Sequence, residues 1–333
     1  MSYNRVRTPK FYIDAVLLAR KLGHIKTENA DGKYYLNPTK TTSLEIPSNG
    51  QKHISIYMHR YFLNSLTHCF ILGHQLSTDG LTANGYIRID PPAPAFDKHT
   101  IFEQQELSTN GWSFFQGNAG TNLDAERFTL ELRGDGDSFT PIGDISVGWS
   151  YEMPHTPDLE LTQTFANESL KVQTTKGGHT LTNTGWTQPP KWGNYSQWKR
   201  SSQVTYPARR SWNLKFSYLA DENSDNSGLM PQYYNEHDVN NNNRGIFERT
   251  SVTIDDVGTP DDDTDDTVTQ SFNIKNDFLS KVMPTINLGL PFIFQPNKDV
   301  QEYAICRVNA NSVALNQVAH QVYDVSLDIV EIW

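Results

Sequence analysis

Four histidines lie close together in one short segment, and imidazole groups are the side chains that most often bind metals or transfer protons near neutral pH. They are His53, His59, His68 and His74. Their spacing matches no familiar zinc pattern, and no aspartate or glutamate lies between the first and the last of them. We therefore expect structural or surface histidines here, with His74 bonded to a backbone carbonyl at a tight corner.

Aspartates form the second group that could do chemistry. Seven of them lie between Asp255 and Asp266. Like charges at this density repel each other, which favours a solvated loop between strands. The alternative is a calcium site, because carboxylate oxygens at Asp261, Asp263 and Asp265 could converge on one ion. The sequence favours the loop and leaves the calcium site open.

Other patterns associated with catalysis do not point to a reaction. Asp158 and Glu160 alternate with leucines as they would in an ordinary strand. The stretch from Leu132 to Phe139 resembles a calcium loop but is not followed by the glutamate that an EF-hand needs, so a tight turn is expected. The chain has no nucleophile elbow, phosphate-binding glycine loop or zinc-protease motif. We expect no catalytic residue, no cofactor and no metal, and hence no enzyme.

The elements that position these residues are mostly strands. Apolar and polar residues alternate in four segments, which predicts strands with one buried and one solvated face. The alternation slips at Val330–Ile332, which predicts a bulge or a strand end. Only Phe11–Leu22 has helical spacing, and Gly23 would end that helix. The four alternating segments are Arg127–Leu132, Asp144–Trp149, Ser211–Leu219 and Val322–Ile329.

Short strands separated by turns, without regular helices between them, are typical of antiparallel sandwiches. The predicted fold class is mainly β, with antiparallel β-sandwich or jelly-roll modules and one short N-terminal helix. Residues 1–42 would form the helix and an arm, and residues 43–155 and 156–333 would form two β modules. The alternative is that the two modules merge into one large β domain.

Composition excludes several classes of function. The 333 residues carry a net charge of −10, and a general nucleic-acid binder needs clustered Lys and Arg instead. No stretch is long and apolar enough to span a membrane as a helix. Cys69 and Cys306 lie far apart in apolar, strand-like runs, so buried free thiols are expected.

Three stretches resemble structural proteins of tailed bacteriophages, especially marine ones. The segment Phe70–Leu76, "FILGHQL", is similar to a strand cassette of discoidin-like, galactose-binding-like jelly rolls, with Gln75 where an asparagine is usual. Arg5–Asp14 and Ala208–Asp221 are similar to segments of phage virion and tail-associated proteins. The resemblance implies a discoidin-like sandwich for residues 43–155, a location in the virion and no catalytic residue.

The expected function is that of a virion structural protein of the tail, baseplate or fibre-attachment region. Its expected partners are copies of itself and other virion proteins. The alternatives are a capsid-associated or decoration protein, and a carbohydrate-binding module for host adsorption. A cluster of four aromatic residues is the expected contact surface, either as an anchor in an interface or as a platform for a host-surface glycan. Its members are Trp186, Trp192, Tyr195 and Trp198.

Overall fold

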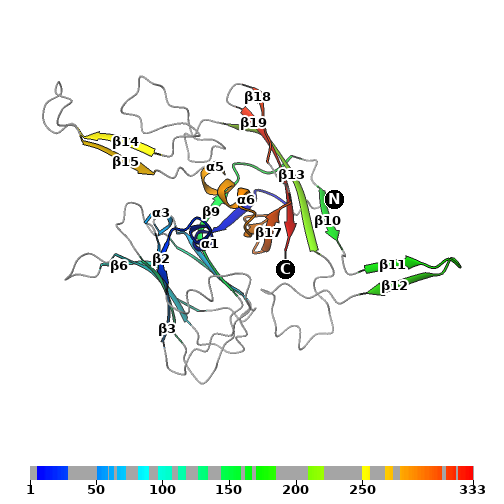
Figure 1. Cartoon of the computed structure of the whole chain (residues 1–333), viewed down its shortest axis with the longest axis horizontal. Coiled ribbons are helices and arrows are strands. Elements are labelled where there is room, and N and C mark those ends of the chain that lie inside the picture. Colours follow the sequence, from blue (N-terminus) through cyan, green and yellow to red (C-terminus); the bar gives the residue numbers. More distant parts are fainter. Residues whose placement is uncertain are drawn as a thin grey trace.

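The computed structural model is built almost entirely from antiparallel strands (Figure 1). This confirms the predicted mainly β class. The parts of the chain that the structure describes are residues 6–28, 51–58, 60–63, 66–72, 82–89, 97–106, 112–117, 127–133, 144–158, 162–166, 170–184, 209–220, 250–255, 267–272, 278–309, 313–319 and 322–332.

A ten-stranded sheet forms the centre of the molecule. Its strands follow the order β10-β13-β19-β17-β16-β1-β9-β4-β7, with β18 paired to β19 outside this path. Every neighbouring pair in it is antiparallel. The strands are β1 (Lys10–Asp14), β4 (His68–Leu72), β7 (Trp112–Gln116), β9 (Asp144–Glu152), β10 (Thr162–Ala166), β13 (Arg209–Ala220), β16 (Phe292–Gln295), β17 (Ala304–Val308), β18 (Leu315–Ala319) and β19 (Val322–Glu331).

A five-stranded sheet of order β2-β3-β8-β5-β6 packs against one face of the large sheet. Its strands are β2 (Ile25–Glu28), β3 (Gln51–Met58), β5 (Thr82–Ile89), β6 (Asp97–Glu106) and β8 (Arg127–Arg133). Two hairpins form separate two-stranded sheets, and in Figure 1 both extend away from the body. They are β11 (Leu170–Thr174) with β12 (Thr180–Thr184), and β14 (Thr250–Asp255) with β15 (Thr267–Phe272).

One continuous apolar core lies between the two sheets. The large sheet contributes residues such as Ile13, Val147 and Leu214, and the small sheet contributes Ile56 and Leu130. Short helices complete this layer, namely α1 (Ala15–Lys21), α3 (Arg60–Leu63), α5 (Phe278–Lys281) and α6 (Met283–Asn287). The arrangement is therefore an antiparallel sandwich with helices at the margin of its core.

The N-terminal helix is shorter than predicted. Residues 10–14 form β1, and α1 begins only at Ala15, so the expected helix over Phe11–Leu22 is wrong in its first turn. Asp14 ends the strand and caps the helix, because its side chain accepts a hydrogen bond from the Leu17 N–H. The end of the helix matches the prediction. Gly23 has a positive φ of 75°, and the N–H of His24 bonds back to the carbonyl of Ala19, as in a Schellman cap.

The alternating segments divide into two groups. In β13 and β19 the predicted pattern is confirmed, with Leu214 and Leu327 buried and Lys215 and Ser326 exposed. In β8 and β9 the predicted solvated face is wrong, because Thr129, Glu131 and Ser146 are buried as well. Both faces of these two strands are covered at those positions. The slip near the C-terminus coincides with the end of β19 at Glu331, so the predicted strand end is confirmed.

The ranges expected as separate modules contribute to the same sheet. β1 comes from residues 1–42, β4, β7 and β9 from residues 43–155, and the remaining strands from residues 156–333. The core between the two sheets likewise combines residues of all three ranges. No helix among the described residues is long and apolar enough to cross a membrane.

Candidate functional site

The face of the large sheet opposite the main core carries a second, smaller cluster, which we call the outer-face cluster. It consists of Tyr12, Phe70, Leu72, Ile293 and Tyr303, with Phe114 and Ile305 packed against it. These residues come from neighbouring strands, and the rings meet edge to face, as between Tyr12 and Phe70 at 5.1 Å. The Tyr12 hydroxyl donates a 2.7 Å hydrogen bond to the Gln295 side chain. The central strands are therefore packed on both faces.

His68 is the most unusual polar side chain of this face. It is 1% exposed, and neither ring nitrogen has a hydrogen-bond partner. Its ring instead packs edge to face against Tyr12 and Phe70. Burial, with a smaller effect of the nearby Lys10 charge, lowers the pKa of His68 to about 3. His68 is therefore a neutral, apolar-packed ring at physiological pH rather than a proton shuttle.

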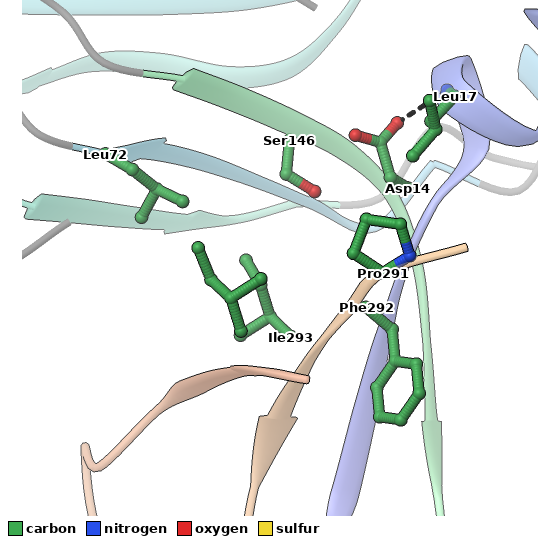
Figure 2. Close-up of a pocket in the computed structure, with 8 residues that line it drawn as sticks. Asp14, Leu17, Leu72, Ser146, Pro291, Phe292 and Ile293 are labelled. Atoms are coloured by element: carbon green, nitrogen blue, oxygen red, sulfur yellow. Dashed lines mark hydrogen bonds between the residues drawn. The ribbon is translucent and has the colours of Figure 1, made fainter. Parts of the chain in front are cut away.

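A small pocket opens beside the first residues of α1 (Figure 2). Asp14 and Ser146 supply its oxygen atoms, and Leu72, Pro291 and Ile293 are among its apolar lining. It has room for about one water molecule, which is much less than a site for an organic substrate needs. The pocket can hold a small polar group at most.

Asp14 is a buried carboxyl group with an altered acidity. Burial raises its pKa to about 7, and hydrogen bonds from the N–H groups of Leu17 and Val16 and from the Ser146 side chain, with the charge of Arg20, oppose the rise. The 2.8 Å bond from the Leu17 N–H fixes one carboxylate oxygen as a helix cap. Because this hydrogen bond holds the Asp14 side chain as the cap of α1, the role of Asp14 is structural.

Gly148 allows the chain to pass through this crowded region. It lies in β9, opposite Asp14 on one side and His68 on the other. A Cβ atom added to it would lie 1.8 Å from the backbone oxygen of Ile13 and 2.7 Å from the backbone nitrogen of Ala15. Only glycine fits this close approach of β1 and β9.

A buried ion pair joins the start of β13 to the end of β19. The Arg210 guanidinium binds Glu331 through two bonds, Nη2 to Oε1 at 3.0 Å and Nε to Oε2 at 3.1 Å. Its Nη1 donates to Glu302 at 2.6 Å, and its Nη2 also donates to the Tyr303 carbonyl. Arg210 and Glu331 are 5% and 2% exposed, so this bidentate pair is isolated from water.

The two cysteines are free and buried, as predicted. Burial raises the pKa of both thiols, and the charges of Asp14 beside Cys69 and of Glu331 beside Cys306 act in the same direction. Thiols with raised pKa values remain protonated at neutral pH, and a protonated thiol is a poor nucleophile. Both side chains therefore act as small apolar groups of the core.

The structure describes two of the four clustered histidines. His53 is exposed on β3 and lies 3.9 Å from the Glu131 carboxylate, opposite it on β8. His68 is buried on β4 of the other sheet, where its ring packs against Tyr12 and Phe70 of the outer-face cluster. His59 and His74 lie outside the described residues. Among the residues that are described, no three His, Cys, Asp or Glu side chains are arranged to hold a metal ion.

The remaining predicted site residues are not brought together by the described part of the chain. The contact surface of Trp186, Trp192, Tyr195 and Trp198 lies outside it, as do Asp261, Asp263 and Asp265 of the aspartate run. Of the pair Asp158 and Glu160, Asp158 is described, and it accepts a 2.6 Å hydrogen bond from the Ser217 hydroxyl. This bond ties the segment after β9 to β13.

Sequence reasoning missed Asp14, Arg210 and Glu331 as buried polar residues. Asp14 fell inside a run that was predicted to be helical, although an aspartate directly before Ala-Val-Leu-Leu is a typical N-cap. The sequence does contain a signal for Glu331, because the alternation of apolar and polar residues in β19 breaks where this charged residue takes a buried position. Its partner lies 121 residues away, and no local pattern could identify it.

Comparisons with known protein families, with curated proteins and with solved structures found no match to this chain.

Proposed function

We propose that the protein is a structural component of the virion of a tailed bacteriophage, located in the tail, baseplate or fibre-attachment region. In this role it assembles with copies of itself and with other virion proteins, and it carries out no reaction of its own. The proposal includes the finer fold expectation of a discoidin-like jelly roll within the sandwich. A capsid-associated or decoration protein is the variant of the same role at another position in the particle.

The similarity of three sequence stretches to phage proteins supports the proposal. In the structure, the described parts of these stretches contain all of β1, all of β13 and the last three residues of β4. All three strands belong to the large sheet, although they are far apart in the sequence. The resemblance therefore concerns separate parts of one scaffold rather than one exchangeable segment.

The observation that carries the proposal is the contrast between a rigid body and an exposed hairpin. The strands that carry the outer-face cluster are buried on both faces, and β13 and β19 are joined by the Arg210–Glu331 pair, so the body has a fixed shape. The hairpin of β11 and β12 extends from it, and Val172 and Leu181 are 55% and 59% exposed. Exposed apolar side chains on a projecting element are suited to contacts between proteins.

Mass spectrometry of purified phage particles tests the proposal directly. A structural protein will be recovered from the particles in a fixed number of copies, in proportion to known structural proteins. A host-encoded or phage-encoded soluble enzyme will be left in the lysate. Absence of the protein from intact, gradient-purified particles would refute the proposed role.

Glycan binding is the second candidate, and the aromatic residues Trp186, Trp192, Tyr195 and Trp198 favour it, because aromatic faces stack on sugar rings. A glycan array with the purified protein measures this. Trp192→Ala is expected to abolish any array signal while thermal stability is retained. If Trp192→Ala instead lowers the melting temperature strongly, the aromatic group belongs to the core and this candidate fails.

A further inference from the structure

The hairpin of β11 and β12, residues 170–184, is a two-stranded sheet that pairs with no other strand among the described residues. All of its side chains that the structure describes, from Val172 to Thr182, are exposed. An isolated two-stranded hairpin is at best marginally stable in water, because it has no second surface against which to bury its side chains. The hairpin would therefore gain stability from a partner.

Its apolar residues point in two directions. Val172 is paired with Thr182, and Leu181 is paired with Gln173. Residues that face each other across a pair share one side of a sheet, and successive residues alternate between sides. Val172 and Leu181 consequently lie on opposite sides of the hairpin. A partner that covers both must surround the hairpin rather than lie along one side of it.

The tip of the hairpin is a tight, hydrogen-bonded turn. Its turn is closed by a 2.8 Å bond from the Thr175 N–H to the His179 carbonyl and a 2.9 Å bond from the Gly178 N–H to the Thr175 carbonyl. The Thr175 hydroxyl accepts a further bond from the His179 N–H. Gly178 has a φ of 81°, and Gly177 precedes it, so the tip is narrow and well defined.

Charge favours another copy of this chain as the partner. Residues 170–184 contain Lys171 and Lys176 and no aspartate or glutamate. Because the whole chain has a net charge of −10, the remainder of the chain carries −12. A basic hairpin on an acidic body is electrostatically complementary to the body of another copy.

We propose that the β11–β12 hairpin is an assembly arm that inserts into a neighbouring copy of this chain, with Val172 and Leu181 buried on its two sides. This proposal rests on the proposed function only in that both require neighbouring copies. An arm of this kind would link the copies into rings or chains, because the arm and the surface that receives it are different parts of the molecule.

Sedimentation velocity of the purified full-length chain over a range of concentrations tests the proposal. The wild type is expected to self-associate, and increasing salt is expected to weaken the association. The charge variant Lys171→Glu with Lys176→Glu should weaken it at least about tenfold, as should Val172→Ser with Leu181→Ser. The melting temperature should change little in both, because Val172, Lys176 and Leu181 are exposed.

The matched control is Lys215→Glu with Arg307→Glu. These two side chains are exposed on the body of the molecule, and the control makes the same change in net charge as the arm variant. It should associate nearly as the wild type does if the arm is the contact. A wild type that stays monomeric, or arm variants that associate like the wild type, would overturn the proposal, as would an equal loss in the control. Recovery of the protein from particles is independent of these results, so an arm that fails this test leaves the proposed virion role standing.

Discussion

The Arg210–Glu331 pair gives the sharpest prediction, because the same guanidinium binds two carboxylates that differ in burial. Glu331 is 2% exposed and forms the bidentate bond, whereas Glu302 is 44% exposed and accepts one bond. Glu331→Gln removes the charge of the buried carboxylate and leaves the buried Arg210 guanidinium paired with the exposed Glu302 carboxylate. Glu302→Gln makes the identical chemical change at the exposed site.

The expected free energies differ several-fold. Removal of one partner from a buried ion pair costs about 3–5 kcal/mol of stability, because the other charge remains desolvated. An exposed pair contributes about 0–1 kcal/mol. Glu331→Gln should therefore lower the free energy of unfolding by about 3–5 kcal/mol, and Glu302→Gln by less than about 1 kcal/mol. Urea titration followed by circular dichroism and tryptophan fluorescence measures both losses.

A double variant separates the cost of a lone charge from the value of the pair. Arg210→Met with Glu331→Leu removes both charges and fills the space with apolar atoms. Its loss of stability should be well below the sum of the losses for Arg210→Met alone and Glu331→Leu alone, since neither charge is left unpaired in the double variant. Equal losses for Glu331→Gln and Glu302→Gln, or an additive double variant, would refute the view that burial gives this pair its energy.

The remaining predictions concern other parts of the molecule. Asp14 has a pKa of about 7 when folded and about 4 when unfolded, so the folded chain binds the extra proton between these values. Its contribution to stability is therefore greatest at low pH and is lost as the pH rises to about 7, by up to about 1.4 kcal/mol per pH unit. Asp14→Asn keeps the helix cap and should flatten that part of the stability profile. Gly148→Ala should destabilise by about 3 kcal/mol or more, measured by urea unfolding, because its Cβ would collide with backbone atoms that cannot move alone. If the aspartate run is only a solvated loop, the melting temperature should be the same in calcium and in EDTA, both for the wild type and for the triple Asn variant at Asp261, Asp263 and Asp265; a calcium-dependent rise that the variant lacks would establish the ion site instead.

Sequence periodicity predicted the strands well where one face of a strand is wet, and less well where both faces are buried. β13 and β19 alternate in burial as their sequences do, with Lys215 and Ser326 in solvent. β9 has the same alternating sequence, yet Ser146 is buried, because the outer-face cluster covers the side that the pattern assigned to water. The alternating pattern shows which residues are apolar, not which are buried. The Ser146 hydroxyl can be buried at low cost because it forms a hydrogen bond with the Asp14 carboxylate.

The prediction of a helix that begins at Phe11 failed for a related reason. Phe11 and Ala15 have the spacing of a helical face, but Phe11 is buried in the main core while Tyr12 enters the outer-face cluster. Such adjacent burial on opposite sides is what a strand in the middle of a sheet requires. A helix would have placed Lys10 and Asp14 on one polar side. In the structure Phe11, Tyr12 and Ile13 are buried in succession and Asp14 is buried as well, which fits a strand covered on both faces. The buried polar residues were harder still to predict, because Arg210 and Glu331 are paired only by the sheet that brings β13 next to β19.

The position of β19 links the C-terminal residues to the stability of the whole body. β19 is an interior strand between β13 and β17, and the Ile332 N–H continues its ladder with a 2.8 Å bond to the Ile305 carbonyl. The buried ion pair lies at the end of the same strand, so loss of the last residues would expose both a sheet edge and a desolvated charge. In the proposed assembly, the body and the arm would therefore respond differently to change. Substitutions near Glu331 should lower the stability of the fold, whereas substitutions at Val172 and Leu181 should leave the fold intact and separate the chain from its neighbours.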